Sequence, residues 1–195
     1  MTFESSKNLS AVGALLIVIG AVLGFVVSFS GILSLIGIIL LLIGLKGLAD
    51  FYKEEGIFNN ALYSMIIAVV GCVVGVGIIA VTAVSALADE GIDWANVDDW
   101  VNYGTDVFTD FDFSPIMDLL VALLVGLIIF YVVLIISMFF LRKSMNQLST
   151  KSGIGLFGTA GILVLIGAVI PVIGLLLIWI GFVLATVALF QMKKE

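Results

Sequence analysis

The side chains best suited to chemistry lie between positions 88 and 113, where eight of the fourteen acids gather and no lysine or arginine occurs. Carboxylate oxygens are the ligands that Ca²⁺ prefers, but the segment has no D-x-[DN]-x-[DN]-G loop closed by a glutamate. We therefore expect a solvated acidic face and no metal site. The eight acids are Asp89, Glu90, Asp93, Asp98, Asp99, Asp106, Asp110 and Asp112.

Apolar residues recur at helical spacing in the same segment. One stripe comprises Trp94, Val97, Val101, Gly104, Phe108 and Phe111, with Asp98, Asp99, Asp106 and Asp110 on the opposite arc. This pattern predicts an acidic amphipathic extracellular helix within residues 89–113. Surface helices that bind anionic lipids are usually basic, so we expect this one to cover the helix bundle or contact a partner. Its candidate contact residues are Trp94, Trp100, Tyr103, Phe108, Asp98, Asp99, Asp106 and Asp110.

A second polar segment, Lys46 to Asn60, separates two apolar runs. Gly56 is expected to end one helix, and Asn59 or Asn60 to cap the next. The functional alternative is a site for a lipid headgroup or a protein partner. Its candidate contacts are Gly56, Phe58, Asn59 and Asn60.

The rest of the chain offers little for catalysis. Histidine is absent and Cys72 is the sole cysteine, which excludes an intrachain disulfide, a Cys/His zinc site and Ser-His or Cys-His catalysis within one chain. Cys72 is expected to be a small buried packing residue. Hydroxyls inside the apolar runs are expected to bond backbone carbonyls of their own helices. They belong to Ser34, Ser64, Thr82, Ser85, Ser137 and Thr186. We expect no enzyme activity and no cofactor.

Composition places the chain in a membrane. Hydrophobic residues make up 63% and charged residues 11%, with a mean hydropathy of +1.34, whereas soluble domains are roughly 45–50% apolar and 25% charged. We predict an all-α, polytopic transmembrane helix bundle forming a single domain, with Ser5, Ser6, Asn8 and Ser10 as candidate caps of the first helix. The alternative is four spans followed by a re-entrant pair split by Pro171 and Gly174. The six predicted spans cover residues 10–28, 32–48, 59–88, 115–141, 154–170 and 173–191.

The charges predict an orientation. With six spans, every basic residue falls on one side: Lys7, Lys46, Lys53, Arg142, Lys143, Lys151, Lys193 and Lys194. Short cytoplasmic loops concentrate Lys and Arg. Both termini are therefore predicted to be cytoplasmic, and residues 89–113 extracellular. The absence of Lys, Arg, Glu and His between the interfaces disfavours an ion-coupled transporter, which needs ionisable groups at depth.

The two ends of the chain are similar to each other. AVGALLIVIGAV at residues 11–22 aligns without a gap to GTAGILVLIGAV at residues 158–169, and the following runs correspond with a one-residue slip. Because both copies start on the same side, they predict a parallel repeat of a helical hairpin. Glycines recurring at seven residues, such as Gly13 and Gly20 or Gly37 and Gly44, predict close helix packing.

The segment containing Gly56, Phe58, Asn59 and Asn60, together with NLSAVGALLIVIG near the start and KSGIGLFGTAGILVLIGAV later on, resembles a family of small multi-pass membrane proteins. That family is mainly archaeal and is catalogued as a domain of unknown function. The resemblance implies a membrane fold and an archaeal origin, without an activity or catalytic residues. It does not cover the acidic segment.

These observations favour an integral membrane protein with a non-enzymatic structural or accessory role. The alternative is a passive channel or carrier for a small solute or cation, with the acidic segment concentrating cations at its mouth. A dry, glycine-packed interior would favour the first function, and a continuous water-wide path the second. The expected partners are membrane lipids and either a protein partner or further copies of the chain, with no nucleic acid.

Overall fold

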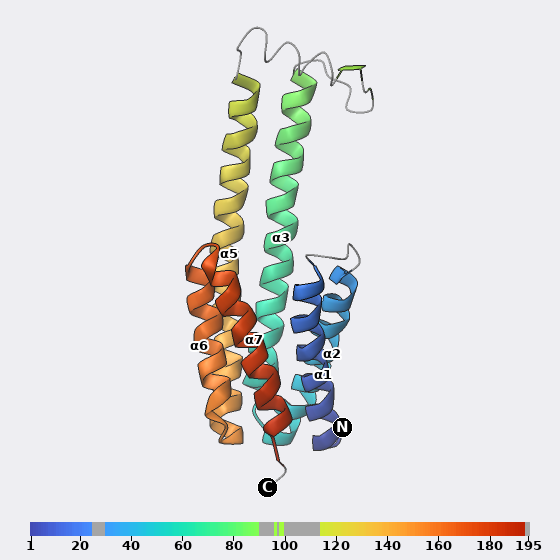
Figure 1. Cartoon of the computed structure of the whole chain (residues 1–195), viewed down its shortest axis with the longest axis vertical. Helices are drawn as coiled ribbons and strands as arrows, with labels where there is room; N and C mark the ends of the chain where they lie inside the picture. The colour runs from blue at the N-terminus through green and yellow to red at the C-terminus, as the bar shows by residue number, and fades with distance from the viewer. Residues whose placement is uncertain (25–29, 90–95, 97, 100–113, 194–195) are drawn as a thin grey trace. The chain divides into compact units, whose positions relative to one another are not determined.

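The computed structural model describes residues 1–24, 30–89, 96, 98–99 and 114–193. No strand occurs among these residues, and five of the helices are long and apolar enough to cross a membrane. The predicted all-α class is confirmed, and the fifth predicted span corresponds to α6, a shorter apolar helix. The helices are α1 (Phe3–Leu23), α2 (Ser30–Tyr52), α3 (Glu55–Asp89), α5 (Ser114–Ser152), α6 (Gly155–Val169) and α7 (Ile173–Gln191) (Figure 1).

The chain divides into two compact units. Residues 1–67 and 134–195 form the six-helix unit, which contains α1, α2, α6 and α7, the start of α3 and the end of α5. Residues 68–133 form the two-helix unit, which contains the remainder of α3 and of α5. Each unit therefore has its own packing.

A single buried cluster joins all the helices of the six-helix unit. Its largest fully buried side chains come from three different helices: Phe157 of α6, Leu48 of α2 and Ile57 of α3. Leu148 of α5 and Leu189 of α7 complete the contact around them. The core lies near the ends of the helices that carry the basic residues.

Helices α1 and α2 pack as a hairpin through small residues. A Cβ atom added to Gly37 would lie 2.7 Å from the carbonyl oxygen of Gly13 and 2.9 Å from the backbone nitrogen of Ile17. One added to Gly44 would overlap the backbone of Ser10. Lipid tails supply no hydrophobic drive for helix association, so this close backbone approach favours van der Waals packing between the helices.

Helices α6 and α7 also approach each other closely, at positions that align with those of the α1–α2 hairpin. A Cβ atom added to Gly181 would lie 3.0 Å from the carbonyl oxygen of Ala160 and 3.3 Å from the backbone nitrogen of Val164. In the predicted alignment, Ala160, Val164 and Gly181 correspond to Gly13, Ile17 and Gly37. The two hairpins thus have close contacts at aligned positions, and the hairpin repeat stays a prediction.

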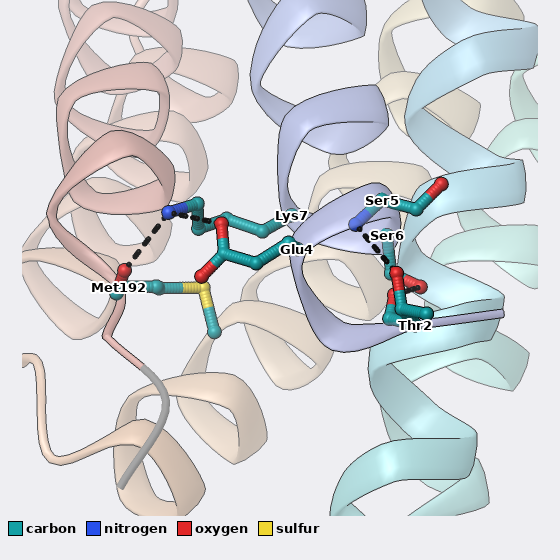
Figure 2. A network of polar contacts seen from close by, with 6 residues as sticks. All are labelled: Thr2, Glu4, Ser5, Ser6, Lys7 and Met192. Carbon is teal, nitrogen blue, oxygen red and sulfur yellow. Dashed lines mark hydrogen bonds and ion pairs between the residues drawn. The ribbon is translucent and has the colours of Figure 1, made fainter.

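The first helix begins earlier than expected. The Thr2 hydroxyl accepts a hydrogen bond from the Ser5 amide at 3.3 Å and so caps α1 at Phe3 (Figure 2). The predicted caps therefore lie inside the helix, and that assignment was wrong. Ser6 and Ser10 are buried there because they face the glycines of α2, and their hydroxyls donate to carbonyls one turn earlier.

The turn between α2 and α3 also differs from the prediction. Lys53 adopts a left-handed backbone with a φ of 51°, and the Glu54 amide donates to the Ala49 carbonyl at 2.9 Å. This is the bonding of a Schellman motif, which ends α2 at Tyr52 without a glycine. Helix α3 then starts at Glu55, so the predicted roles of Gly56 as a terminator and of the following asparagines as caps were wrong.

Candidate functional site

A line of polar contacts connects α3 to α5 within the six-helix unit. We call it the α3–α5 polar ladder, and its members are spaced along one face of each helix. The Ser144 hydroxyl donates to the Ile57 carbonyl at 2.5 Å, and both residues are buried. The ladder consists of Ile57, Asn60 and Ser64 on α3 and Ser137, Ser144 and Gln147 on α5.

Asn60, one of the predicted contact residues, has a side chain held by two hydrogen bonds. Its side chain is 7% exposed, and its amide donates to the Gln147 side-chain oxygen at 2.9 Å and to the Gly56 carbonyl at 2.6 Å. Gly56 makes room for this pair, because an added Cβ would meet the Gln147 side-chain amide. Two of the four predicted contacts in this segment thus hold α3 against α5.

The serines at the other end of the ladder bond across the helix interface. Ser137 donates to the Ser64 carbonyl at 2.9 Å, and the two hydroxyl oxygens are 3.0 Å apart. Own-helix bonding was predicted for both residues, and for them it was wrong. It is confirmed for Ser85, which donates to Val81, and for Thr186, which donates to the Phe182 carbonyl.

Ser144 and Gln147 of the ladder were not predicted from the sequence. Both residues lie beyond Arg142, where the span was predicted to end. The available signal was spacing, since Ser137, Ser144 and Gln147 recur at seven and three residues and share one helix face.

Charged residues surround the same end of the six-helix unit. Lys7 forms an ion pair with Glu4 at 3.0 Å and donates to the Met192 carbonyl at 3.3 Å, where it complements the negative end of the α7 dipole (Figure 2). Lys151 pairs with Glu54 at 3.2 Å. These contacts join α1 to the C-terminal end of α7, and α5 to the α2–α3 turn.

Phe58 and Asn59 complete the predicted contacts of this segment. Both side chains are half-buried, and the Lys46 ammonium lies 5.9 Å from the centre of the Phe58 ring. A cation at that distance from a ring face is weakly attracted to it. The more accessible residues of the same turn are Asp50, Phe51, Lys53 and Glu55.

Asp89, Asn96, Asp98 and Asp99 are the described residues of the acidic segment 89–113. The Asn96 side chain accepts from the Asp98 amide at 3.1 Å and donates to the Asp99 carboxylate at 3.0 Å. Asp98 and Asp99 are helical, and the Asn96 side chain is hydrogen-bonded to both residues. The other predicted contacts lie outside the described residues: Trp94, Trp100, Tyr103, Phe108, Asp106 and Asp110.

The two-helix unit has an apolar groove with a volume of about 290 Å³. Its wall includes Cys72, Ile79 and Phe130, and α3 and α5 approach closely at Gly75 and Gly126. Cys72 is exposed, so its predicted burial was wrong. The neighbouring Gly71, whose added Cβ would overlap the Val133 side chain, occupies the packed face instead.

The interior of the six-helix unit is closely filled. A cavity of about 20 Å³ lies among five helices and is lined by apolar side chains and Ser144, whose hydroxyl is already bonded to Ile57. That volume is about the space of one water molecule. Among the described residues, no buried side-chain nitrogen or oxygen lacks a hydrogen-bond partner, and no group of three or more His, Cys, Asp or Glu could hold a metal.

The length and apolarity of the helices define a helical membrane protein. The chain belongs to the family described as "Protein of unknown function (DUF996)", whose model matches residues 33–190. It is also similar to the "Uncharacterized protein MJ1644" of Methanocaldococcus jannaschii, with 24% identity over 197 residues that cover 100% of this chain and 96% of the relative. No solved structure matches the chain. The predicted resemblance is confirmed, and the descriptions of the family and of the relative state no activity.

The serine pair gives the first testable prediction. In a double-mutant cycle of Ser64→Ala and Ser137→Ala, we expect a coupling free energy of about 0.6 kcal/mol, the average for hydrogen bonds between membrane helices. Unfolding of the purified protein in mixed detergent and SDS micelles, followed by far-UV circular dichroism, measures it. Ser85→Ala paired with Ser137→Ala is the control and should show no coupling. Zero coupling would contradict the hydrogen bond between the hydroxyls of Ser64 and Ser137.

Proposed function

We propose that the protein is a non-enzymatic structural or accessory component of the cell membrane. It acts as a compact helical platform whose aqueous surfaces contact a protein partner or further copies of the chain. The observation that carries the proposal is the packing of the described residues of the six-helix unit, where buried hydroxyls are bonded and the cavity among α1, α2, α5, α6 and α7 is about the size of one water molecule. A water-filled path for a solute would need a polar passage in place of this packing.

The proposal includes an orientation with both termini in the cytoplasm. All described bases belong to the six-helix unit, whereas Asp89, Asp98 and Asp99 belong to the other unit. Lysine and arginine near the ends of spans are retained on the cytoplasmic side during insertion. This distribution supports an extracellular position for residues 89–113.

The α2–α3 turn is the proposed cytoplasmic contact surface. Gly56 and Asn60 are committed to the α3–α5 polar ladder, so a partner would contact the exposed residues beside them. Asp50 and Lys53 project from this turn and are exposed. A charge exchange at these two positions keeps the net charge and leaves the ladder unchanged.

Purification in mild detergent tests the proposal. We expect a protein that elutes with the wild type in a fixed ratio and is lost from the variant Asp50→Lys/Lys53→Glu. The control Lys143→Glu/Asn146→Lys changes two exposed residues of α5, lowers the net charge by one, and should retain the partner. Loss from both variants, or from neither, would contradict the assigned surface.

The channel alternative is tested with the same preparation. The purified protein in liposomes is expected to leave the flux of small solutes and monovalent cations at the level of protein-free vesicles. A solute-specific flux that depends on the protein would overturn the accessory role and establish the alternative.

A further inference from the structure

The connection between α6 and α7 has an unusual backbone. Val172 has a φ of 64° and a ψ of −68°, and the Ile173 amide donates to the Pro171 carbonyl at 2.8 Å, which makes a γ-turn with a positive central φ. A β-branched residue in such a conformation is rare, and a turn of this type is strained. The connection is therefore held by the packing of the hairpin.

Close contact of two glycines holds this turn. Gly174 lies directly against the backbone of Gly167, and an added Cβ on Gly167 would approach the Gly174 carbonyl oxygen at 2.5 Å. The two helices thus meet within a few residues of the connection, which leaves room for only a minimal loop.

The turn satisfies most of its own backbone. Four of the five amide donors from residue 170 to residue 175 are bonded within the hairpin, and Pro171 has no amide hydrogen to satisfy. Ile170 donates to Ile166, Ile173 to Pro171, Gly174 to Ile170 and Leu175 to Val172, at 2.8–3.2 Å. The carbonyls of residues 170, 171 and 172 all accept. Irregular backbone is excluded from lipid because of unpaired polar groups, and this turn has few of them.

The side chains at the turn are exposed and entirely apolar. Val172 is 83% exposed, Ile173 68%, and Leu175 67%. No polar side chain occurs between residues 160 and 185 except the Trp179 indole, whose N–H donates to the Val18 carbonyl at 3.2 Å. Turns commonly carry Gly, Pro, Asn, Asp or Ser, and this one has Pro171 and Gly174 but none of the three polar types.

The length of α6 limits how far the turn can reach. Its 15 residues span about 22 Å at about 1.5 Å per residue, less than the roughly 30 Å of the hydrocarbon layer. Arg142 of α5 lies against Gly161, with its Cα 3.2 Å from a Cβ added there. Because an arginine side chain keeps its charge at the interface, the part of α6 in the hydrocarbon is shorter than the whole helix.

From these observations we propose that the α6–α7 hairpin is re-entrant: its turn ends inside the hydrocarbon layer, where Val172 and Ile173 contact the acyl chains of the lipids. We assign the acyl chains as the neighbours of the turn for three reasons. The exposed side chains are apolar, the backbone of the turn is largely self-bonded, and α6 is too short to reach the water on the opposite side. The inference rests on the membrane location in the proposed function but is independent of which side is cytoplasmic.

Cysteine labelling in vesicles tests the re-entrant hairpin. In a Cys72→Ser background, Val172→Cys and Leu175→Cys place a thiol at or near the turn, while Thr150→Cys and Asn96→Cys serve as aqueous controls. The proteins are reconstituted in phosphatidylcholine and phosphatidylglycerol vesicles, and a sulfonated maleimide is applied outside or, after permeabilisation by freezing and thawing, on both faces. Labelling in SDS verifies each thiol, and far-UV circular dichroism verifies each fold.

We expect labelling of both controls, from opposite faces, and loss of labelling for Cys at 172 and 175 on both faces. A bimane probe attached at either of these positions should then be quenched more strongly by lipids with a doxyl group at carbon 12 of the acyl chain than by lipids with one at carbon 5. Labelling of Val172→Cys from either face overturns the proposal, because the turn then reaches water.

Protection without quenching, together with a disulfide between two copies of Val172→Cys, would also overturn it, since a second chain would then cover the turn. The controls report separately on the orientation. If Thr150→Cys and Asn96→Cys are labelled from the same face, the proposed topology fails, whereas the result at position 172 is still decided by its own labelling.

Discussion

Gly44→Ala is expected to destabilise the protein by about 1–3 kcal/mol, the usual cost of overpacking a filled interface. An added Cβ would overlap the Ser10 backbone and side chain and lie 2.7 Å from the Ser6 carbonyl oxygen. A backbone cannot move aside as a flexible side chain can, so α1 and α2 must separate. Their separation would also disturb Ser6 and Ser10, which are both fully buried.

Gly77→Ala is the matched control for this change. Gly77 lies inside α3, and no atom lies within 4 Å of an added Cβ. Alanine is favoured over glycine in a helix interior by up to about 1 kcal/mol, so this variant should be as stable as the wild type or more stable. Unfolding in mixed detergent and SDS micelles, followed by far-UV circular dichroism, compares the two. Equal stability of the two variants would refute glycine-mediated packing of α1 against α2.

The apolar helices could be predicted because hydrophobicity is a property of the sequence itself. The last span was predicted at residues 173–191 and α7 covers Ile173–Gln191. Helix α5 ends eleven residues beyond the predicted end at residue 141. The difference arose because Arg142 and Lys143 were taken to end the helix. Such charges mark the membrane surface, and α5 continues past them to Ser152 since Ser144 and Gln147 have partners on α3.

The turn chemistry of residues 46–60 could not be predicted from residue types. Gly56 and the asparagines have the preferences of helix termini, yet Lys53 takes the left-handed position. Packing outweighed the helix-terminus preferences of these residues. Gly56 leaves space for the Gln147 side chain, and Asn60 donates a hydrogen bond to Gln147. The role of Asn60 is therefore set by its contact with Gln147, which lies 87 residues away in the chain.

The α3–α5 polar ladder depends on information that a single sequence lacks. Whether the Ser64 hydroxyl bonds its own helix or Ser137 depends on how α3 and α5 are aligned. The two serines are 73 residues apart in the chain. Likewise, Gly71 is packed because it lies on the side of α3 that faces α5, and Cys72 is exposed because it does not. Glycine spacing indicated that helices approach closely, while the choice of partner required the structure.

Asn60→Leu is expected to destabilise the protein by about 1 kcal/mol, the usual net contribution of a hydrogen bond, because the Asn60–Gln147 bond is partly buried. The substitution removes the donor for the Gln147 side-chain oxygen, which accepts at 2.9 Å. Replacing both partners of a hydrogen bond by apolar groups is often nearly neutral, so Asn60→Leu/Gln147→Leu should recover much of the lost stability. The same unfolding measurement gives all the values.

Asn59→Leu is the neighbouring control, since this half-buried side chain lies outside the ladder. We expect a change within about 0.5 kcal/mol, as for most substitutions away from a buried network. The comparison also separates the two roles considered for Asn60, because a partner contact would leave the stability of Asn60→Leu unchanged and abolish co-purification of the partner. A structural role predicts lower stability for Asn60→Leu, recovery in the double variant, and a partner that still elutes with the recovered protein.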